Sequence, residues 1–369
     1  MVFSIKKAIL AVVSIVGVTN SAAIFNVSGS NSSVSGLVVR AHAGPDAESN
    51  NPQTVPPDND PFRAQTPSQD LCKDKGRDEQ GTYFCSQVDQ VLYTKVELGK
   101  RQQAWSDELV PFNEPVSLHF HGPLHLKQVG FYQPNGDGSY SRKGFYHAQS
   151  QTSEGITFMG NFGGTASSSV FTKTFGNSLS FVNSRGDGGD GGGGGPTILA
   201  DTTVSDTADF SMFTDQKCDD GSCGYIQPGA AARKGFPGPN RMFLFEFLMP
   251  HSHPNADGSD PNDKPTLWLL NARIPYTQQY YKCSCWDFGC GEFDIFEVVN
   301  KHDEKALSIF HLNPLGFGDS NCFCRPSDGP IKVALFMDGN DGGWVSVKVL
   351  GRSDGTRFGG SLSAGEVTS

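Results

Sequence analysis

The chain has 369 residues and a formal net charge of −10, from 29 basic and 39 acidic side chains. This acidic balance argues against a nucleic-acid partner, because binding to phosphates needs a basic face. The 44 glycines and 22 prolines indicate many turns, and no long helical pattern appears between them. The composition therefore favours an all-β protein.

The first residues have the pattern of a secretory signal peptide. Lys6 and Lys7 precede the apolar run 8–18, and small residues follow it. The run is shorter than the roughly 20 apolar residues of a membrane-spanning helix, and the C-terminal tail lacks the apolar end of a lipid-anchor signal. We expect a secreted protein, extracellular or in a cell wall, with no membrane anchor.

The chain contains 9 cysteines, and export predicts that most of them form disulfide bonds. Cys218 and Cys223 are the easiest local pair, because the turn-forming residues between them let the two Cα atoms approach. A zinc cluster built from the Cys-x-Cys pairs at 283–285 and 322–324 is an alternative, although Cys-x-x-Cys is the usual spacing. The sequence does not determine the connectivity.

Composition suggests five regions along the chain. Residues 24–70 are rich in Ser, Asn, Pro and Asp, and two Asn-x-Ser sites within them predict glycosylation. The expected regions are a signal peptide (1–23), a disordered arm (24–70), a small N-terminal module (71–105), a β-sandwich (106–352) and a flexible tail (353–369).

Short segments of β-branched and aromatic residues, separated by Gly, Pro and Asn, predict strands throughout the expected sandwich. The clearest are 116–120, 124–132, 156–159, 170–175, 242–249, 267–270, 291–299, 305–312, 331–336 and 344–350. Their regular spacing favours a jelly-roll β-sandwich of the concanavalin-like type that contains disulfides.

Three acidic residues in one predicted strand give the strongest indication of chemistry. Glu292 and Asp294 have the same parity and share a strand face, whereas Glu297 has the opposite parity. A β-bulge at 295–296 returns Glu297 to the face of the other two. Adjacent carboxylates repel and raise each other's pKa, so the arrangement is costly without a purpose. A solvated strand face is the alternative.

Glycoside hydrolysis uses such a set of acids. A retaining enzyme needs an ionised carboxylate as nucleophile and a protonated one as general acid, about 5–5.5 Å apart. A third carboxylate between them helps to separate their pKa values. The acids therefore predict a retaining glycoside hydrolase.

The motif Glu-x-Asp-x-x-Glu after Gly291 resembles the bulged catalytic strand of glycoside hydrolase family 16, and 265–271 resembles that family's Pro-Ala-x-Trp-Leu strand. More closely, the chain resembles the fungal Tos (target of SBF) cell-wall family, described as glycosyl hydrolases. The segments that carry this resemblance are 111–124, 144–150, 242–250 and 283–297, within about residues 72–350.

The resemblance implies Glu292 as nucleophile, Asp294 as its partner and Glu297 as acid/base. It also implies a β-1,3-glucan substrate cleaved internally. Two departures affect the expected substrate subsites: His121 stands where the family has Arg, and Asp263 begins Asp-Lys-Pro-Thr in place of Asp-Met-Pro-Ala.

Four further residues are candidate substrate-binding positions: Trp268, Asn271, Trp286 and His311. Trp268 either stacks on a sugar ring or fills the core, and Trp286 either contacts substrate or packs on disulfides. His311, on the strand after the acids, is expected to face the same cleft.

His119, His121 and His125 are spaced as in some metal sites, but no matching distal set appears beyond His251 and His253. We therefore expect no metal and no cofactor. The prediction is a monomeric endo-acting β-1,3-glucanase whose partner is β-glucan. A glucan transglycosylase and a non-catalytic glucan-binding wall protein are the alternatives.

Overall fold

The structure, a computed structural model, describes residues 86–94, 102–104, 107–163, 167–173, 176–191, 194–224, 226–274, 291–312, 315–318, 321–339, 343–351, 358–363 and 366. The expected signal peptide, the expected arm and Trp286 lie outside these residues, as do the cysteines at 283, 285 and 290. In the described part of the chain, no helix has the length and apolar character needed to cross a membrane.

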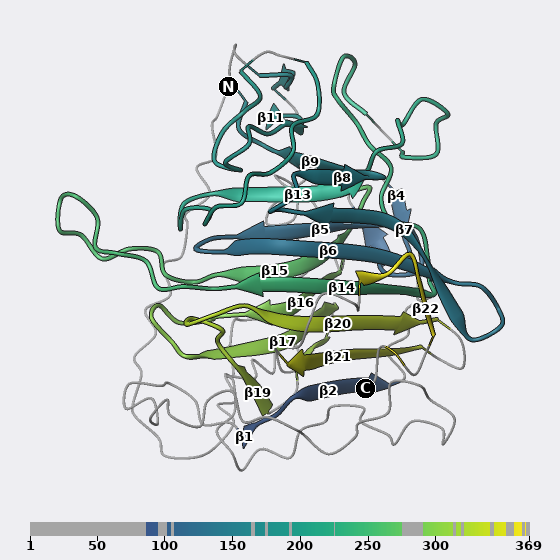
Figure 1. Ribbon diagram of the computed structural model, residues 1–369. Coiled ribbons are helices and arrows are strands. Elements are labelled where there is room, and N and C mark those ends of the chain that lie inside the picture. Colours follow the sequence, from purple (N-terminus) through teal and green to yellow (C-terminus); the bar gives the residue numbers. More distant parts are fainter. Residues whose placement is uncertain are drawn as a thin grey trace, which may run out of the picture. The chain divides into compact units, whose positions relative to one another are not determined.

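Two large β-sheets account for most of the described residues (Figure 1). In order, the ten-stranded sheet contains β1 (Ser86–Gln87), β19 (Asn321–Cys324), β17 (Lys305–Leu312), β16 (Glu292–Glu297), β15 (Thr266–Asn271), β5 (Val116–His121), β13 (Asp209–Thr214), β9 (Ile156–Gly160) and β12 (Ser180–Phe181), with β18 (Leu315–Gly318) paired to β17.

The eight-stranded sheet contains, in order, β2 (Gln90–Thr94), β21 (Trp344–Gly351), β20 (Ile331–Asp338), β14 (Arg241–Leu248), β6 (His125–Pro134), β7 (Ser139–His147) and β22 (Ser361–Ser363), with β8 (Thr152–Glu154) paired to β7. Two small pairs complete the strands: β3 (Gln102–Ala104) with β4 (Asp107–Leu109), and β10 (Phe171–Thr172) with β11 (Gly176–Asn177). The expectation of an all-β protein is confirmed, and the jelly-roll connectivity stays a prediction.

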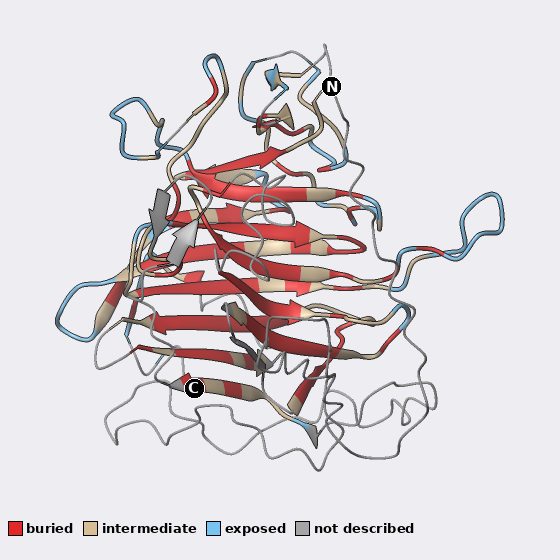
Figure 2. Ribbon diagram, turned by 180° about the vertical axis from the view of Figure 1, so that it is seen from behind, coloured by how far each residue is buried: buried red, intermediate tan, exposed pale blue. Residues whose placement is uncertain are grey.

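Aromatic side chains join the two sheets face to face. The rings of Phe247 in β14 and Phe296 in β16 have centroids 5.4 Å apart, and those of Tyr146 in β7 and Phe158 in β9 are 4.9 Å apart. Each fully buried Phe contributes roughly 1.5–3 kcal/mol through removal of apolar surface from water. Figure 2 shows the resulting pattern, with buried residues along the strands and exposed residues in the loops.

The strand β14 is apolar on both faces, which explains its nearly continuous hydrophobic sequence. Phe243 and Phe245 point into the core between the sheets. Met242 and Leu244 point the other way, into a second cluster that includes Phe358. Part of the region 353–369 that the sequence predicts as a flexible tail therefore packs on the sandwich, through Phe358 and β22.

The N-terminal described residues also belong to the sandwich. Ser86 and Gln87 pair with β19 at the edge of the ten-stranded sheet, and β2 pairs with β21 at the edge of the eight-stranded sheet. Residues 86–94, within the expected N-terminal module 71–105, thus contribute a strand to each large sheet.

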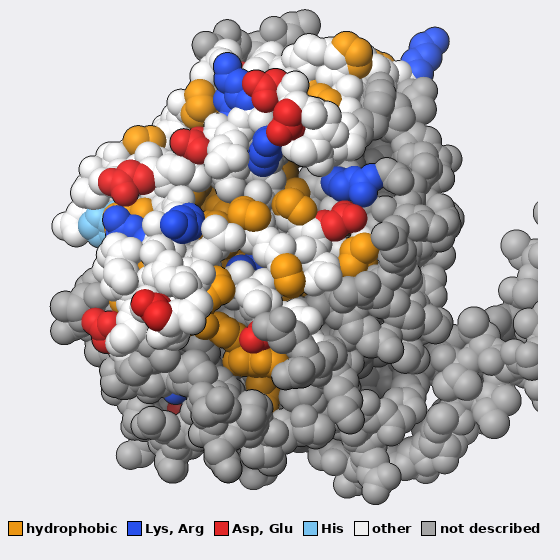
Figure 3. Space-filling model, turned by 90° about the vertical axis from the view of Figure 1, so that its right-hand side faces the viewer, with side chains coloured by type: hydrophobic (Ala, Val, Ile, Leu, Met, Phe, Trp, Pro, Cys, Tyr) orange, Lys and Arg blue, Asp and Glu red, His pale blue; other side chains and the backbone are white. Residues whose placement is uncertain are grey.

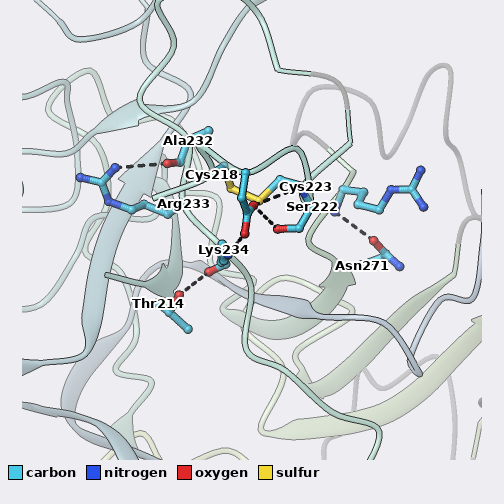
Figure 4. The surroundings of a disulfide bond; sticks show 10 residues. Thr214, Cys218, Ser222, Cys223, Ala232, Arg233, Lys234 and Asn271 are labelled. Carbon is cyan, nitrogen blue, oxygen red and sulfur yellow. Dashed lines mark hydrogen bonds and ion pairs between the residues drawn. A yellow bond between two sulfur atoms is a disulfide. The ribbon is translucent and has the colours of Figure 1, made fainter. Parts of the chain in front are cut away.

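Cys218 and Cys223 form a disulfide bond with their Cα atoms 5.8 Å apart, as the sequence predicts. Figure 4 shows this bond beside Ser222 and Lys234. Cys322 and Cys324 are disulfide-bonded as well. The alternative of a zinc cluster that includes these two thiols is therefore wrong.

The surface in Figure 3 carries acidic and basic side chains side by side, with apolar side chains between them. On the described part of this face the charges of both signs are mixed. An extended basic surface for phosphate binding does not form there.

Candidate active site

A β-bulge in β16 brings the three acidic side chains to one face of the ten-stranded sheet. The pairing of β16 with β15 shifts register between Leu267 and Trp268, and its pairing with β17 shifts between Asp294 and Glu297. Ile295 and Phe296 both enter the core, fully buried. Glu297 therefore returns to the face of Glu292 and Asp294, as the sequence predicts.

Each acid lies in a row of directly paired side chains that crosses the sheet. The rows are Leu307–Glu297–Thr266–His121–Asp209, Ile309–Asp294–Trp268–His119–Ser211 and His311–Glu292–Leu270–Ser117. The three acids thus occupy adjacent rows on one strand, which we call the acid trio. The other side chains in these rows come from β17, β15, β5 and β13, which are distant from one another in the sequence.

His311 is the polar side chain that contacts the acid trio most directly. Its Nε2 lies 2.9 Å from Asp294 Oδ2, and both side chains are almost fully buried. The expectation that His311 faces the acids is therefore met. Among the described residues, Oε2 of Glu292 is buried without a hydrogen-bond partner, so this oxygen is available to a group that enters the site.

Burial and mutual repulsion raise the pKa of every member of the acid trio. Burial raises the pKa of Glu297 to about 8; Asp294 raises it as well, while His311 and Lys264 oppose the shift. Burial followed by the charge of Asp294 raises the pKa of Glu292, and burial raises that of Asp294. At neutral pH the trio therefore carries fewer than three negative charges and holds at least one proton.

Trp268 and His119 lie beside the acids. Trp268 pairs directly with Asp294 and is only 3% exposed. Its ring stacks on His119 with centroids 5.3 Å apart. Burial lowers the pKa of His119 to about 3, so this imidazole is neutral at physiological pH. Trp268 is therefore buried on the acid face, outside the core cluster between the sheets, and its contact with a sugar ring stays a prediction.

Asn271 lies away from the acid trio, contrary to the sequence-based expectation that it binds substrate. It shares the core-facing side of β15 with Leu269 and is fully buried. Its amide donates to Glu114, and its carbonyl oxygen accepts the backbone N–H of Arg273. Figure 4 includes Asn271 near the disulfide loop. Strand parity accounts for this orientation, because Asn271 lies three residues after Trp268 and so points to the opposite face.

The histidines of the expected 119–125 pattern do not converge on a metal site in the described residues. Nε2 of His119 bonds to Ser117, Nδ1 of His121 to Asp209, and Nε2 of His125 to Asp201. These contacts lie in different rows or on different sheets. His121 nevertheless lies in the row of Glu297.

Two groups of donor atoms within the described chain are close enough to hold a metal ion: Glu292, Asp294 and His311, and separately His251, Asp263 and His302. In the first group, the hydrogen bond between His311 and Asp294 already explains why their donor atoms lie close together. No local pattern in the sequence indicates the second group, because its members come from three loops.

Two neighbours of the acid trio were not singled out from the sequence. The positive charge of Lys264 lowers the pKa of Glu297, and Thr266 pairs directly with Glu297 across the strands. Both precede Trp268 in the sequence. The Asp-Lys-Pro-Thr segment that begins at Asp263, noted above as an expected departure, was the signal that could have pointed to them.

Comparison with protein families matches two models to the chain. The model for the C-terminal part of cell wall protein YJL171C/Tos1 matches residues 138–369, and that for the N-terminal part matches residues 78–134. No solved structure matches.

Several curated relatives are similar to the chain. "Probable circularly permuted 1,3-beta-glucanase TOS1" of Saccharomyces cerevisiae is 41% identical over 212 residues, which are 56% of this chain and 45% of the relative. "Probable circularly permuted 1,3-beta-glucanase YJL171C" of the same yeast is 35% identical over 296 residues, 73% of this chain and 71% of the relative. A Candida albicans protein of the same description, PGA52, is 38% identical over 295 residues, 74% and 73% of the two chains.

The chain spans less than half the length of the first of these relatives and nearly three quarters of the other two. The C-terminal family model alone covers more than half of the chain. The protein therefore belongs to the YJL171C/Tos1 family of cell wall proteins.

Proposed function

We propose that this protein is a secreted or wall-located glycoside hydrolase that cleaves β-1,3-glucan within the polymer and retains the anomeric configuration. The observation that carries the proposal is the β16 bulge, which puts Glu297 on the face of Glu292 and Asp294. The linkage comes from the relatives, which are described as 1,3-beta-glucanases.

In the first step, a carboxylate oxygen of Glu292 attacks the anomeric carbon while the bond from that carbon to the leaving sugar oxygen breaks. Glu297 donates its proton to the leaving oxygen. A pKa of about 8 allows Glu297 to hold this proton at neutral pH. The pKa of Glu292 is raised as well, so the reactive form is the one in which Glu297 is protonated and Glu292 is ionised. The product is a glycosyl ester of Glu292 and a shortened glucan chain.

In the second step, Glu297 takes a proton from water as the water oxygen attacks the anomeric carbon. The ester bond breaks and the carboxylate of Glu292 is restored. Asp294 lies between the two on β16 and bonds to His311, and its proposed role is to hydrogen-bond the nucleophile. If a sugar hydroxyl replaces water, the same site joins glucan chains.

The test measures reducing ends released from laminarin by the wild type and by Glu292→Gln. The variant is expected to lose several orders of magnitude in kcat, because removal of an essential acid abolishes one chemical step. Glu154→Gln is the matched control, since Glu154 is an exposed glutamate of β8. Product chains longer than the substrate indicate transglycosylation.

Equal, near-zero rates for folded wild type and Glu292→Gln would overturn the hydrolase proposal. Retained sedimentation with insoluble β-1,3-glucan in that case would favour a glucan-binding wall protein.

A further inference from the structure

A second cluster of chemically active side chains lies at one end of the strands that form the acid face. His251 follows β14, Asp263 precedes β15, and His302 belongs to the loop between β16 and β17. Three loops that are distant in sequence thus meet at one carboxylate. The carboxylate of Asp263 is fully buried, whereas the two imidazoles are 39% and 46% exposed.

The donor atoms of this cluster converge on one point. Nδ1 of His251 lies 2.8 Å, and Nδ1 of His302 lies 3.0 Å, from the same oxygen, Oδ2 of Asp263. All three donor atoms lie within 4.8 Å of one another. Two imidazole nitrogens and one carboxylate oxygen form a donor set that suits zinc, with a fourth position open to water.

The opposite side of each imidazole is held by another carboxylate. Nε2 of His251 lies 2.8 Å from Glu304 Oε1, and Nε2 of His302 lies 2.6 Å from Asp260 Oδ1. Metal-binding histidines usually donate their second N–H to a carboxylate in this way, which fixes the ring and leaves the ligating nitrogen free of its proton.

Asp263 is fixed from behind by Arg325, which is itself fully buried. Arg325 donates to Oδ1 of Asp263 and to the backbone carbonyls of Met249 and Pro250. The oxygen that faces the two histidines is therefore held in position. His302 also adopts a φ of 63°, in the left-handed region that is uncommon for residues other than Gly. Such conformations are often kept at functional positions.

Three carboxylates surround the two imidazoles, and their negative charges favour a cation at this point. Asp263 lies between the two rings. Glu304 contacts the far side of His251, and Asp260 contacts the far side of His302.

We propose that His251, Asp263 and His302 form a binding site for a divalent transition-metal cation, with zinc as the reference ion. Bound there, the cation links the start of β15 to the loop that follows Glu297. Its role is structural, and it is independent of the proposed hydrolysis.

The test uses the full chain, freed of metal with a chelator. Binding of Zn²⁺ is measured by calorimetry, and the melting temperature is measured with and without Zn²⁺. The wild type is expected to bind zinc at this site and to melt at a higher temperature when it is bound, because a ligand of the native state stabilises it. His251→Ala and His302→Ala are expected to lose this binding, whereas His253→Ala, an exposed histidine two residues away, keeps it.

Two further comparisons make the result specific. His311→Ala removes a donor of the other candidate group and is expected to leave the zinc isotherm of this site unchanged. Glu304→Gln and Asp260→Asn keep all three ligands and are expected to weaken binding about 10–100-fold. Ca²⁺ is expected to bind poorly, since it prefers oxygen donors.

Absence of zinc binding by the wild type would overturn the proposal. Binding of equal affinity and stoichiometry in the His251 and His302 variants would overturn it as well. If an alanine variant does not fold, the Glu304 and Asp260 variants decide the question.

Discussion

Glu297 lies at the end of β16, where burial and neighbouring charges act on its carboxyl group in opposite directions. Burial and Asp294 raise its pKa to about 8, while His311 and Lys264 lower it. The proposed acid/base role uses this balance, because the group must give up a proton and take one back in each cycle.

The activity of the wild type is expected to fall as pH rises through about 8, because Glu297 then loses the proton that it must donate. In Lys264→Met the pKa of Glu297 rises further, since a favourable positive charge is removed. The basic limb of kcat/KM on laminarin is therefore expected to move to higher pH. Lys301→Met, which removes an exposed ion pair with Asp260, is the control. A basic limb that does not move in Lys264→Met contradicts this electrostatic account.

His311 is a positioning residue for Asp294, to which it bonds at 2.9 Å. His311→Ala is expected to lower kcat by about one to two orders of magnitude, roughly the size of one hydrogen bond to a charged group. KM should change little if the histidine acts only through Asp294. A change confined to KM would instead assign His311 to direct contact with the sugar.

At the scale of a strand, the β16 bulge links the chemistry to the core. The extra residue sends both Ile295 and Phe296 inward, and Phe296 stacks on Phe323 at 5.0 Å while it contacts Phe247 of the opposite sheet. The packing of these rings holds the bulge, and the bulge determines where Glu297 points.

Phe296→Ala is expected to lower the free energy of unfolding by about 3–5 kcal/mol, because it leaves a cavity between the two sheets. Phe171→Ala is the matched control, since Phe171 is 68% exposed and its removal creates no cavity. Denaturant unfolding followed by tryptophan fluorescence measures both. Similar losses for the two variants would contradict the role of Phe296 in the core.

The bulge and the shared face of the acids were predictable from the sequence, because both follow from the parity of residues within one strand. The orientation of Asn271 follows from parity as well, because it lies three residues after Trp268 on β15 and so points to the opposite face. Its hydrogen bond with Glu114 was not predictable, because that residue is distant in the sequence. The grouping of His251 with Asp263 and His302 depends on three loops, and no local periodicity encodes their approach.

At the scale of the whole molecule, buried titratable groups couple stability to pH. The pKa of His119 is lowered to about 3 because the ring is fully buried. The folded state therefore keeps the neutral imidazole, and its stabilising contribution is complete above the ordinary pKa of 6.5. That contribution is lost as pH falls from 6.5 towards 3, by up to about 1.4 kcal/mol per pH unit.

The free energy of unfolding of His119→Asn is therefore expected to fall less than that of the wild type between pH 6.5 and 4.5. The acid trio, whose pKa values are raised, acts in the opposite sense: its contribution is present at low pH and is lost as pH rises through about 8. Because both proteins retain the trio, this effect cancels in their difference. Parallel pH profiles for the two proteins would show that His119 does not titrate on unfolding.

Residues 86–94 supply an edge strand to each of the two large sheets. Their two strands cover the outermost backbone groups of β19 and β21, which would otherwise be open to pairing with another molecule. Gln90 in β2 pairs with Lys348 in β21. The hydrogen bonds of β2 can therefore form only after nearly all of the polypeptide has been synthesised. The first of the described strands are thus among the last to pair, and the edges of both sheets stay open until they do.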